Sequence, residues 1–231
     1  MLAITVLFCL AADIYQKGFM TKIVITGFGV FAGVTKNPSE AIVNHLKAWH
    51  LEDCDIRTTV LVCSVETLNQ FFRELDENLL SWSPTENILL IHLGVDSGAS
   101  TIKLETTAYN NMSFRVPDQT GYKPDLLTII PTVGFDSPLV SCLDISALCE
   151  EMVSDKCCAI ISTDPGRYLC NFIYYRSLCF CENNNKLSSR RSCQSIFIHV
   201  PAIDVITLED QISFVKRAVE TLVHSISMVK A

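Results

Sequence analysis

The chain has 231 residues, which is long enough for one large domain or two small ones. Hydrophobic residues make up 49% of it, so a sizeable core can form and global disorder is excluded. The 18 basic and 25 acidic side chains give a formal net charge of −7, and only Arg190 and Arg191 form a basic cluster, which excludes an electrostatic surface for nucleic acid.

The first 19 residues are set apart from the rest. The segment from Leu2 to Ala12 is apolar, like the core of a secretion signal, but it lacks a basic region and is too short to span a bilayer. Met20 stands directly before the first convincing strand. We therefore expect residues 1–19 to be an N-terminal extension that is not part of the fold, with a functional signal as the alternative. Residues 20–231 are expected to form a single domain without a membrane segment.

The remaining sequence alternates between β-branched runs and runs with helical spacing. Strands are predicted over residues 22–26, 56–62, 87–93, 101–107, 158–162 and 195–200. Helices are predicted over residues 38–49, 65–80, 144–154, 170–180 and 208–229, the first with Asn37 as its N-cap. Residues 110–125 and 182–195 are predicted as loops, the second being the most loop-like segment. Strands that alternate with helices imply an α/β fold with a largely parallel sheet covered on both faces.

Eleven cysteines are present, an odd number, and most lie in apolar runs. A chain of this length builds its own core and does not need disulfides. Cys179, Cys181 and Cys193 fit no zinc spacing and have no histidine among them, so no metal is predicted. We interpret most of the cysteines as buried, reduced thiols in a cytoplasmic protein.

One cysteine has a different setting. In the segment Asp164-Pro-Gly-Arg-Tyr-Leu-Cys-Asn171, a turn-forming Pro-Gly pair leads to Cys170, which opens a helix-like apolar run. A thiol at a helix start faces unpaired backbone N–H groups and the positive end of the helix dipole. That field favours the thiolate, which is the nucleophilic form, so Cys170 is a candidate nucleophile, with a core thiol as the alternative.

A histidine completes the parts that a thiol hydrolase needs. His199 comes near the end of the predicted strand 195–200, where the strand presents it at the edge of the sheet. A structural histidine is the alternative interpretation. A cysteine on a helix and a base on a strand are typical of nucleophilic catalysis.

Several motifs, in this order, resemble those of type I pyroglutamyl peptidases (pyrrolidone-carboxylate peptidases). They are Thr26-Gly-Phe-Gly-Val-Phe31, Asn37-Pro-Ser39, Gly94-Val95 with Leu104-Glu105, Gly166-Arg-Tyr-Leu-Cys-Asn171 and His199-Val-Pro201. The resemblance extends from about Met20 to the C-terminus. Each motif alone is weak, whereas their order is fairly specific.

The resemblance implies a three-layer α/β/α sandwich and a cysteine exopeptidase that removes N-terminal pyroglutamate from peptides. It implies a triad of Cys170, His199 and Glu105. Arg115 matches an arginine near the catalytic centre. No cofactor is implied, and the oligomeric state stays open.

The resemblance also implies where the substrate binds. Phe28 and Phe31 match aromatic residues that line the pocket for the lactam ring. This is chemically sensible, because a neutral lactam needs flat apolar walls and few polar groups. The alternative to a pocket role for both phenylalanines is ordinary core packing. The alternative to a catalytic role for Arg115 and Glu105 is a position on the solvent-exposed surface.

Some positions depart from the family pattern. Pro165 replaces an alanine before the nucleophile, which removes an N–H. Val30 replaces a proline, and so does a residue near Cys63 and Ser64. These departures favour one alternative, an inactive relative that binds pyroglutamyl peptides. A second alternative is a nucleotide-binding protein, but Gly27, Gly29 and Gly33 do not have the GxGxxG spacing.

Overall fold

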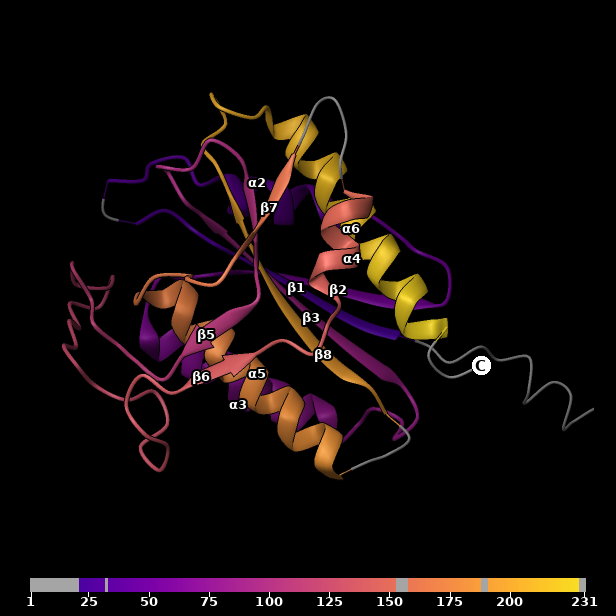
Figure 1. Ribbon diagram of the computed structural model, residues 1–231, viewed down its shortest axis with the longest axis horizontal. Coiled ribbons are helices and arrows are strands. Elements are labelled where there is room, and N and C mark those ends of the chain that lie inside the picture. Colours follow the sequence, from indigo (N-terminus) through magenta and orange to yellow (C-terminus); the bar gives the residue numbers. More distant parts are fainter. Residues whose placement is uncertain (1–20, 32, 153–157, 188–190, 229–231) are drawn as a thin grey trace, which may run out of the picture.

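A computed structural model describes residues 21–31, 33–152, 158–187 and 191–228, so the predicted extension 1–19 lies outside the described residues. Its centre is a six-stranded sheet with the strand order β2-β1-β3-β8-β4-β7 (Figure 1). The strands are β1 (Thr21–Phe28), β2 (Cys54–Leu61), β3 (Asn87–Val95), β4 (Ile102–Glu105), β7 (Ala159–Ser162) and β8 (Cys193–Val200). Neighbouring strands are parallel except β4 and β8, which are antiparallel. The predicted α/β fold with a mostly parallel sheet is confirmed.

Helices cover both faces of the sheet (Figure 1). One face carries α2 (Pro38–Leu46), α4 (Ile145–Glu151) and α6 (Leu208–Met228), and the other carries α3 (Val65–Leu79) and α5 (Leu169–Leu187). The three layers form the expected α/β/α sandwich. Within the described residues, no helix is both long enough and apolar enough to cross a membrane.

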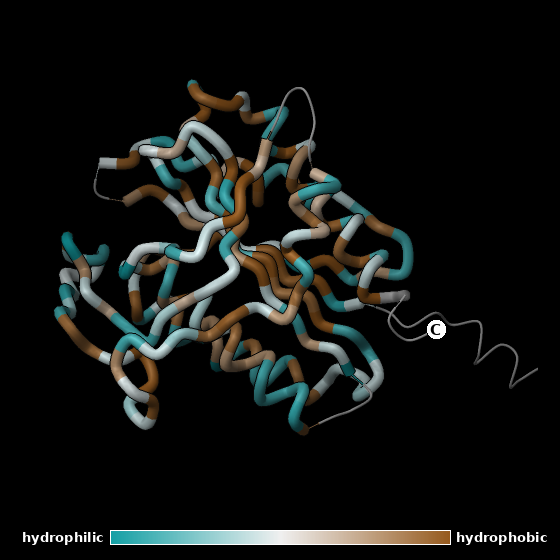
Figure 2. The backbone as a smooth tube through the Cα atoms, viewed as in Figure 1, coloured by the Kyte–Doolittle hydropathy of each residue, from teal (hydrophilic) through white to brown (hydrophobic). Residues whose placement is uncertain are grey.

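The strands supply the core of both layers because successive side chains point to opposite faces. In β1, Ile23 and Ile25 pack against the α2, α4 and α6 layer, whereas Val24 packs on the α3 and α5 side. β3 is buried from Asn87 to Gly94, as expected for an interior parallel strand. Figure 2 shows the hydrophobic residues concentrated along these central strands.

The predicted strand 101–107 is two strands in the structure. β4 ends at Glu105, paired with Ser162, which is the last residue of its neighbour β7. Beyond that point the chain leaves the main sheet, and β5 (Thr107–Tyr109) pairs with β6 (Pro138–Val140) in a separate two-stranded sheet. The sequence did not predict β6, because three residues are too few to show a period.

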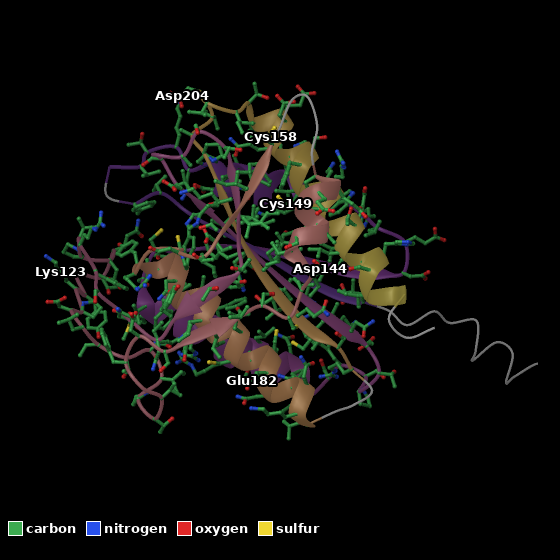
Figure 3. The ribbon with its side chains drawn as sticks, viewed as in Figure 1. Lys123, Asp144, Cys149, Cys158, Glu182 and Asp204 are labelled. Carbon is green, nitrogen blue, oxygen red and sulfur yellow. The ribbon has the colours of Figure 1, made fainter. Side chains whose placement is uncertain are left out.

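The loop predicted over residues 182–195 is wrong at both ends. α5 continues to Leu187 and β8 begins at Cys193. An ion pair of 2.8 Å between Lys186 and Glu182 joins successive turns of α5, and the Asn184 side chain donates to the Phe180 carbonyl at 2.9 Å. Figure 3 shows Glu182 on α5, and the 12 residues of helix from Cys170 to Glu182 span about 18 Å.

Helix α2 begins as predicted but ends early. Asn37 is its N-cap and accepts a hydrogen bond from the Ser39 amide, and Pro38 is the first helical residue. The helix ends at Leu46, so Trp49, predicted on its apolar face, lies in the following turn, where its amide donates to the Leu46 carbonyl at 3.0 Å. Trp49 still packs against the core.

Candidate active site

A tight turn presents the candidate nucleophile. Gly166 has a φ of +79°, a left-handed conformation that glycine adopts without strain, and Pro165 directly precedes it. The Asp164 carboxylate accepts from the Gly166 amide at 3.1 Å and from the Arg167 guanidinium at 2.6 Å. The turn therefore forms with Pro165 in it, and Asp164 supplies its stabilising acceptor.

Cys170 is the second residue of α5. The Phe172 amide donates to the Tyr168 carbonyl at 3.1 Å, and this is the bond with which the helix begins. The amides before Phe172 precede that first bond, so they lie at the positive end of the helix dipole, next to the Cys170 sulfur. This position favours a negative charge on the sulfur.

Gly94 of β3 provides the space for that sulfur. A Cβ atom on Gly94 would lie 3.0 Å from Cys170 Sγ and 2.7 Å from Phe197 Cζ. The helix start therefore rests directly on the glycine, and any side chain there would displace the sulfur or the ring.

His199 lies beside the same glycine. In the β3–β8 register, His199 pairs with Gly94, so the imidazole and the Cys170 sulfur meet at the carboxyl ends of two neighbouring strands. His199 is 7% exposed, and its Nδ1 lies 2.8 Å from Oε1 of Glu105. Glu105 is fully buried at the end of β4, which pairs with β8.

The residues around His199 favour a protonated imidazole. Burial alone lowers the pKa of His199, but the charge of Cys170 and a hydrogen bond to it, together with the Glu105 carboxylate, raise that pKa to about 10. The His199 ring is therefore an imidazolium near neutral pH. The Glu105 backbone is fixed separately, since its carbonyl accepts from the Tyr174 hydroxyl at 2.7 Å.

Asn171 ties the helix that carries Cys170 to the neighbouring segment. Its fully buried side chain accepts from the Tyr109 amide at 2.8 Å, and it donates to the carbonyls of Tyr109 and Asn111 at 2.8 and 2.9 Å. Because Asn171 directly follows Cys170, these three bonds fix the first turn of α5 against β5.

Aromatic rings gather next to Cys170. Tyr168 lies 6.3 Å from Phe31 and 4.6 Å from Phe114, measured between ring centroids. Burial raises the pKa of Tyr168 to about 12, and the nearby groups Cys63, Asp118 and Cys170 add to this. Tyr168 is therefore a neutral phenol. Phe31 is partly exposed, whereas Phe28 is buried in the core on the α3 and α5 side.

The structure does not bring Arg115 to the triad by any contact within the described residues. Arg115 is exposed, in the loop that also carries Phe114. It therefore lies one residue from a ring that packs against Tyr168. The roles predicted for Arg115, Phe28 and Phe31 remain predictions.

The family model of pyroglutamyl peptidases matches residues 21–230. The chain belongs to this family. A pyrrolidone-carboxylate peptidase of Enterobacter sp. (strain 638) is 31% identical over 188 residues, covering 79% of this chain and 78% of the relative. Human pyroglutamyl-peptidase 1 is 28% identical over 202 residues, covering 85% and 87%. The solved pyrrolidone carboxyl peptidase of Thermococcus litoralis superposes with a TM-score of 0.78 at 26% identity, covering 90% of this chain and 96% of that structure.

Membership in the pyroglutamyl peptidase family leaves the nucleotide-binding alternative without support. Gly27 and Gly29, on which that alternative depended, have structural roles instead. A Cβ on Gly27 would lie 2.5 Å from the Ser39 carbonyl oxygen, so this glycine allows α2 to pack on β1. The Gly29 amide donates to the Leu61 carbonyl at 2.9 Å and does not point to a phosphate.

Sequence reasoning gave no role to three residues at this site, Tyr168, Gly94 and Asn171. Tyr168 and Asn171 flank Cys170 within the family motif, so their positions carried a signal. Gly94 was part of another motif, but its contact with the sulfur depends on how α5 crosses the sheet. That crossing cannot be read from the sequence.

The cysteine prediction is partly wrong. Eight of the cysteines in the described residues, all except Cys158, are free thiols. Only Cys63, Cys181 and Cys193 are buried, whereas Cys142 and Cys158 are exposed and the others are partly exposed. Within the same residues, no group of three acidic, histidine or cysteine side chains is arranged to hold a metal ion.

Proposed function

We propose that this chain hydrolyses the bond after an N-terminal pyroglutamyl residue of a peptide, with Cys170 as nucleophile, His199 as acid and base, and Glu105 as the group that orients His199. The observation that carries the proposal is the meeting of sulfur and imidazole over Gly94, with a buried carboxylate 2.8 Å behind the imidazole. Family membership supports the same reaction.

The reaction has two halves. The Cys170 thiolate attacks the pyroglutamyl carbonyl, and the tetrahedral intermediate collapses to a thioester as His199 gives its proton to the departing amine. His199 then takes a proton from a water molecule that attacks the thioester, which releases pyroglutamate and restores the thiolate and the imidazolium. Glu105 keeps the imidazole in one tautomer and stabilises its charge, as in other triads.

The start of α5 supplies the stabilisation of the oxyanion. The Cys170 amide lies in the first turn, where N–H groups have no intrahelical acceptor. Such a donor aimed at the developing oxyanion contributes on the order of 3 kcal/mol to transition-state binding. No metal or organic cofactor is required by this chemistry.

The lactam ring of the substrate is neutral and flat, so it needs apolar walls. We propose that Phe31 and Tyr168 form these walls, with Phe28 supporting them from the core and Arg115 positioning the peptide from the loop. Cys63 stays protonated there, because burial and then the charge of Cys170 raise its pKa to about 12. Cys63 therefore does not compete with Cys170 as the nucleophile.

The substrate partner that we propose is a peptide with N-terminal pyroglutamate, and the compartment is the cytoplasm, in keeping with the free thiols described above. We keep residues 20–231 as one catalytic domain. The inactive-relative alternative rested mainly on Pro165, and the turn around Pro165 is well formed.

The test is hydrolysis of a pyroglutamyl arylamide under reducing conditions. We expect the parent to release the arylamine and Cys170→Ser to release none. Cys158→Ser, which alters an exposed cysteine on another part of the molecule, is the matched control and keeps the parent rate. A prolyl arylamide, with the same ring but no lactam carbonyl, is expected to stay intact. Turnover by Cys170→Ser would overturn the assignment, and binding without turnover by the parent would favour an inactive relative.

A further inference from the structure

Two buried thiols that the proposed mechanism does not use lie in contact. Cys181 is on α5 and Cys193 is the first residue of β8, and their sulfur atoms are 3.1 Å apart. Cys193 has no exposed surface, and Cys181 is 3% exposed. A disulfide bond needs a separation of about 2.05 Å, so a shift of about 1 Å would join them.

The backbone around Cys193 is held against the helix. The Asn185 side chain accepts from the Cys193 amide at 2.8 Å and donates to the Cys193 carbonyl at 2.9 Å. Asn185 lies one helical turn after Cys181, so these two bonds hold the start of β8 against α5 at that point. The two sulfurs therefore meet because the secondary structure is anchored there, and their contact does not depend on a flexible segment.

A third thiol lies on the segment beside the start of β8. Cys142 is exposed, and the neighbouring Ser141 hydroxyl donates to the Ser195 carbonyl at 2.7 Å, which fixes the segment beside β8 two residues from Cys193. Burial raises the pKa of Cys142, and the charge of Cys193 adds to that rise, in keeping with their closeness. We call Cys142, Cys181 and Cys193 the thiol cluster.

We propose that the thiol cluster is an oxidative modification site, in which a small disulfide of the glutathione class converts Cys181 and Cys193 into a disulfide through Cys142. The Cys142 thiolate attacks the small disulfide, forms a mixed disulfide and releases one small thiol. Cys193 attacks the Cys142 sulfur and releases the second small thiol. Cys181 then attacks Cys193, which returns Cys142 as a thiol. In sum, two protein thiols are oxidised and one small disulfide is reduced to two thiols.

The cross-link would join the two elements that carry the candidate catalytic pair. α5 carries Cys170 at its start and β8 carries His199 near its end, and both lie away from the cross-link along their elements. Closing the loop of residues 182–192 restricts the unfolded chain. We therefore expect the oxidised protein to keep its fold and to melt at a higher temperature, by roughly 5 °C.

The experiment treats the full-length protein with glutathione disulfide, alkylates the remaining thiols and maps the products by peptide mass spectrometry. We expect a Cys181–Cys193 disulfide, with a mass loss of two hydrogens, and a rise in Tm that a reductant reverses. Glutathione disulfide also reacts with Cys170, so the same measurement is repeated with Cys170→Ser. The comparison uses the difference in Tm between oxidised and reduced forms of each variant, so a loss of stability from a substitution cancels.

Three variants separate the parts of the proposal. Cys181→Ala is expected to abolish the redox-dependent shift in Tm. Cys179→Ala, which removes a partly buried thiol two residues earlier on the same helix, is expected to retain it. Cys142→Ser is expected to slow formation of the disulfide at least tenfold, and an unchanged rate would overturn the relay through Cys142. Cys181 and Cys193 both recovered as alkylated thiols after oxidation would overturn the site itself.

Discussion

Two histidines on adjacent central strands are both buried, yet one is neutral and the other is protonated. His92 on β3 is fully buried between two hydroxyls, with Thr26 Oγ1 2.7 Å from its Nδ1 and Ser177 Oγ 2.5 Å from its Nε2. Burial lowers the pKa of His92 to about 3, so it is neutral. His199, on the neighbouring strand β8, has its pKa raised to about 10 because its partners are Cys170 and Glu105.

The difference shows that burial alone does not make a histidine neutral. The groups that contact the imidazole determine whether it is protonated. Hydroxyls satisfy the ring of His92 without adding charge, so desolvation prevails. At His199, the influence of Cys170 and Glu105 outweighs the desolvation that burial causes. Both histidines also support α5, since Cys170 rests against Gly94 beside His199, and Ser177, two turns later, bonds to His92.

The largest expected effect comes from removing the negative partner of His199. Glu105→Gln keeps the shape and a hydrogen bond but loses the charge. We expect kcat/KM for a pyroglutamyl arylamide to fall roughly 10³- to 10⁴-fold, as in other triads. In this variant the His199 imidazolium also loses its proton at a lower pH, because the Glu105 carboxylate is one of the groups that raise the pKa of His199.

Two readouts check this prediction. The alkaline limb of the pH–rate profile, near pH 10 in the parent, is expected to move toward lower pH in Glu105→Gln. Glu182→Gln, which removes the carboxylate of an exposed ion pair on α5, is the control and leaves both rate and profile unchanged. An unmoved alkaline limb in Glu105→Gln would show that another group sets it.

The next effect concerns Gly94, which lies on the strand of His92 and pairs with His199. Gly94→Ala places a Cβ 3.0 Å from the Cys170 sulfur and 2.7 Å from the Phe197 ring, so the nucleophile must shift. A displacement near 1 Å lowers rates by about a hundredfold, and we expect that loss in kcat with a slower alkylation of Cys170. Gly98→Ala is the matched control, because its Cβ meets only Asp96 Oδ1 at 3.6 Å. Full activity in Gly94→Ala would mean that the sulfur does not rest there during catalysis.

The sequence predicted the parts of the site that are local. Cys170 stood out because a Pro-Gly turn and an apolar run surround it, and both are short-range signals. His199 stood out because it ends a β-type run. The burial of Glu105 and its bond to His199 were not readable from the residues, because they arise from the antiparallel pairing of β4 with β8.

The errors in the fold have the same origin. The Asn-rich segment after Glu182 looks like a loop because asparagine has poor helix propensity. It is helical as far as Leu187 because the earlier turns of α5 are anchored on the sheet and side chains bridge its last turns. The contact of Gly94 with Cys170, and that of His92 with Ser177, depend on the crossing of a helix over a strand, which only tertiary packing determines.

The smallest effect tests the neutral histidine through acid stability. The pKa of His92 is about 3 in the fold against about 6.5 in an unfolded chain, so the unfolded state binds the proton first. The stability that a neutral His92 provides is therefore complete above about pH 6.5 and is lost as the pH falls toward 3. The slope approaches about 1.4 kcal/mol per pH unit.

His92→Gln removes this titration while it keeps groups that can bond to Thr26 and Ser177. We expect the variant to be less stable at pH 7, because the ring packs in the core. The gap to the parent should narrow by on the order of 2 kcal/mol between pH 6.5 and pH 4.5, measured by urea unfolding. His224→Gln, at an exposed histidine of α6, should leave the pH dependence unchanged. A gap that stays constant on acidification would mean that His92 accepts a proton in the native protein, and then hydroxyl partners would suffice to keep a buried imidazole charged.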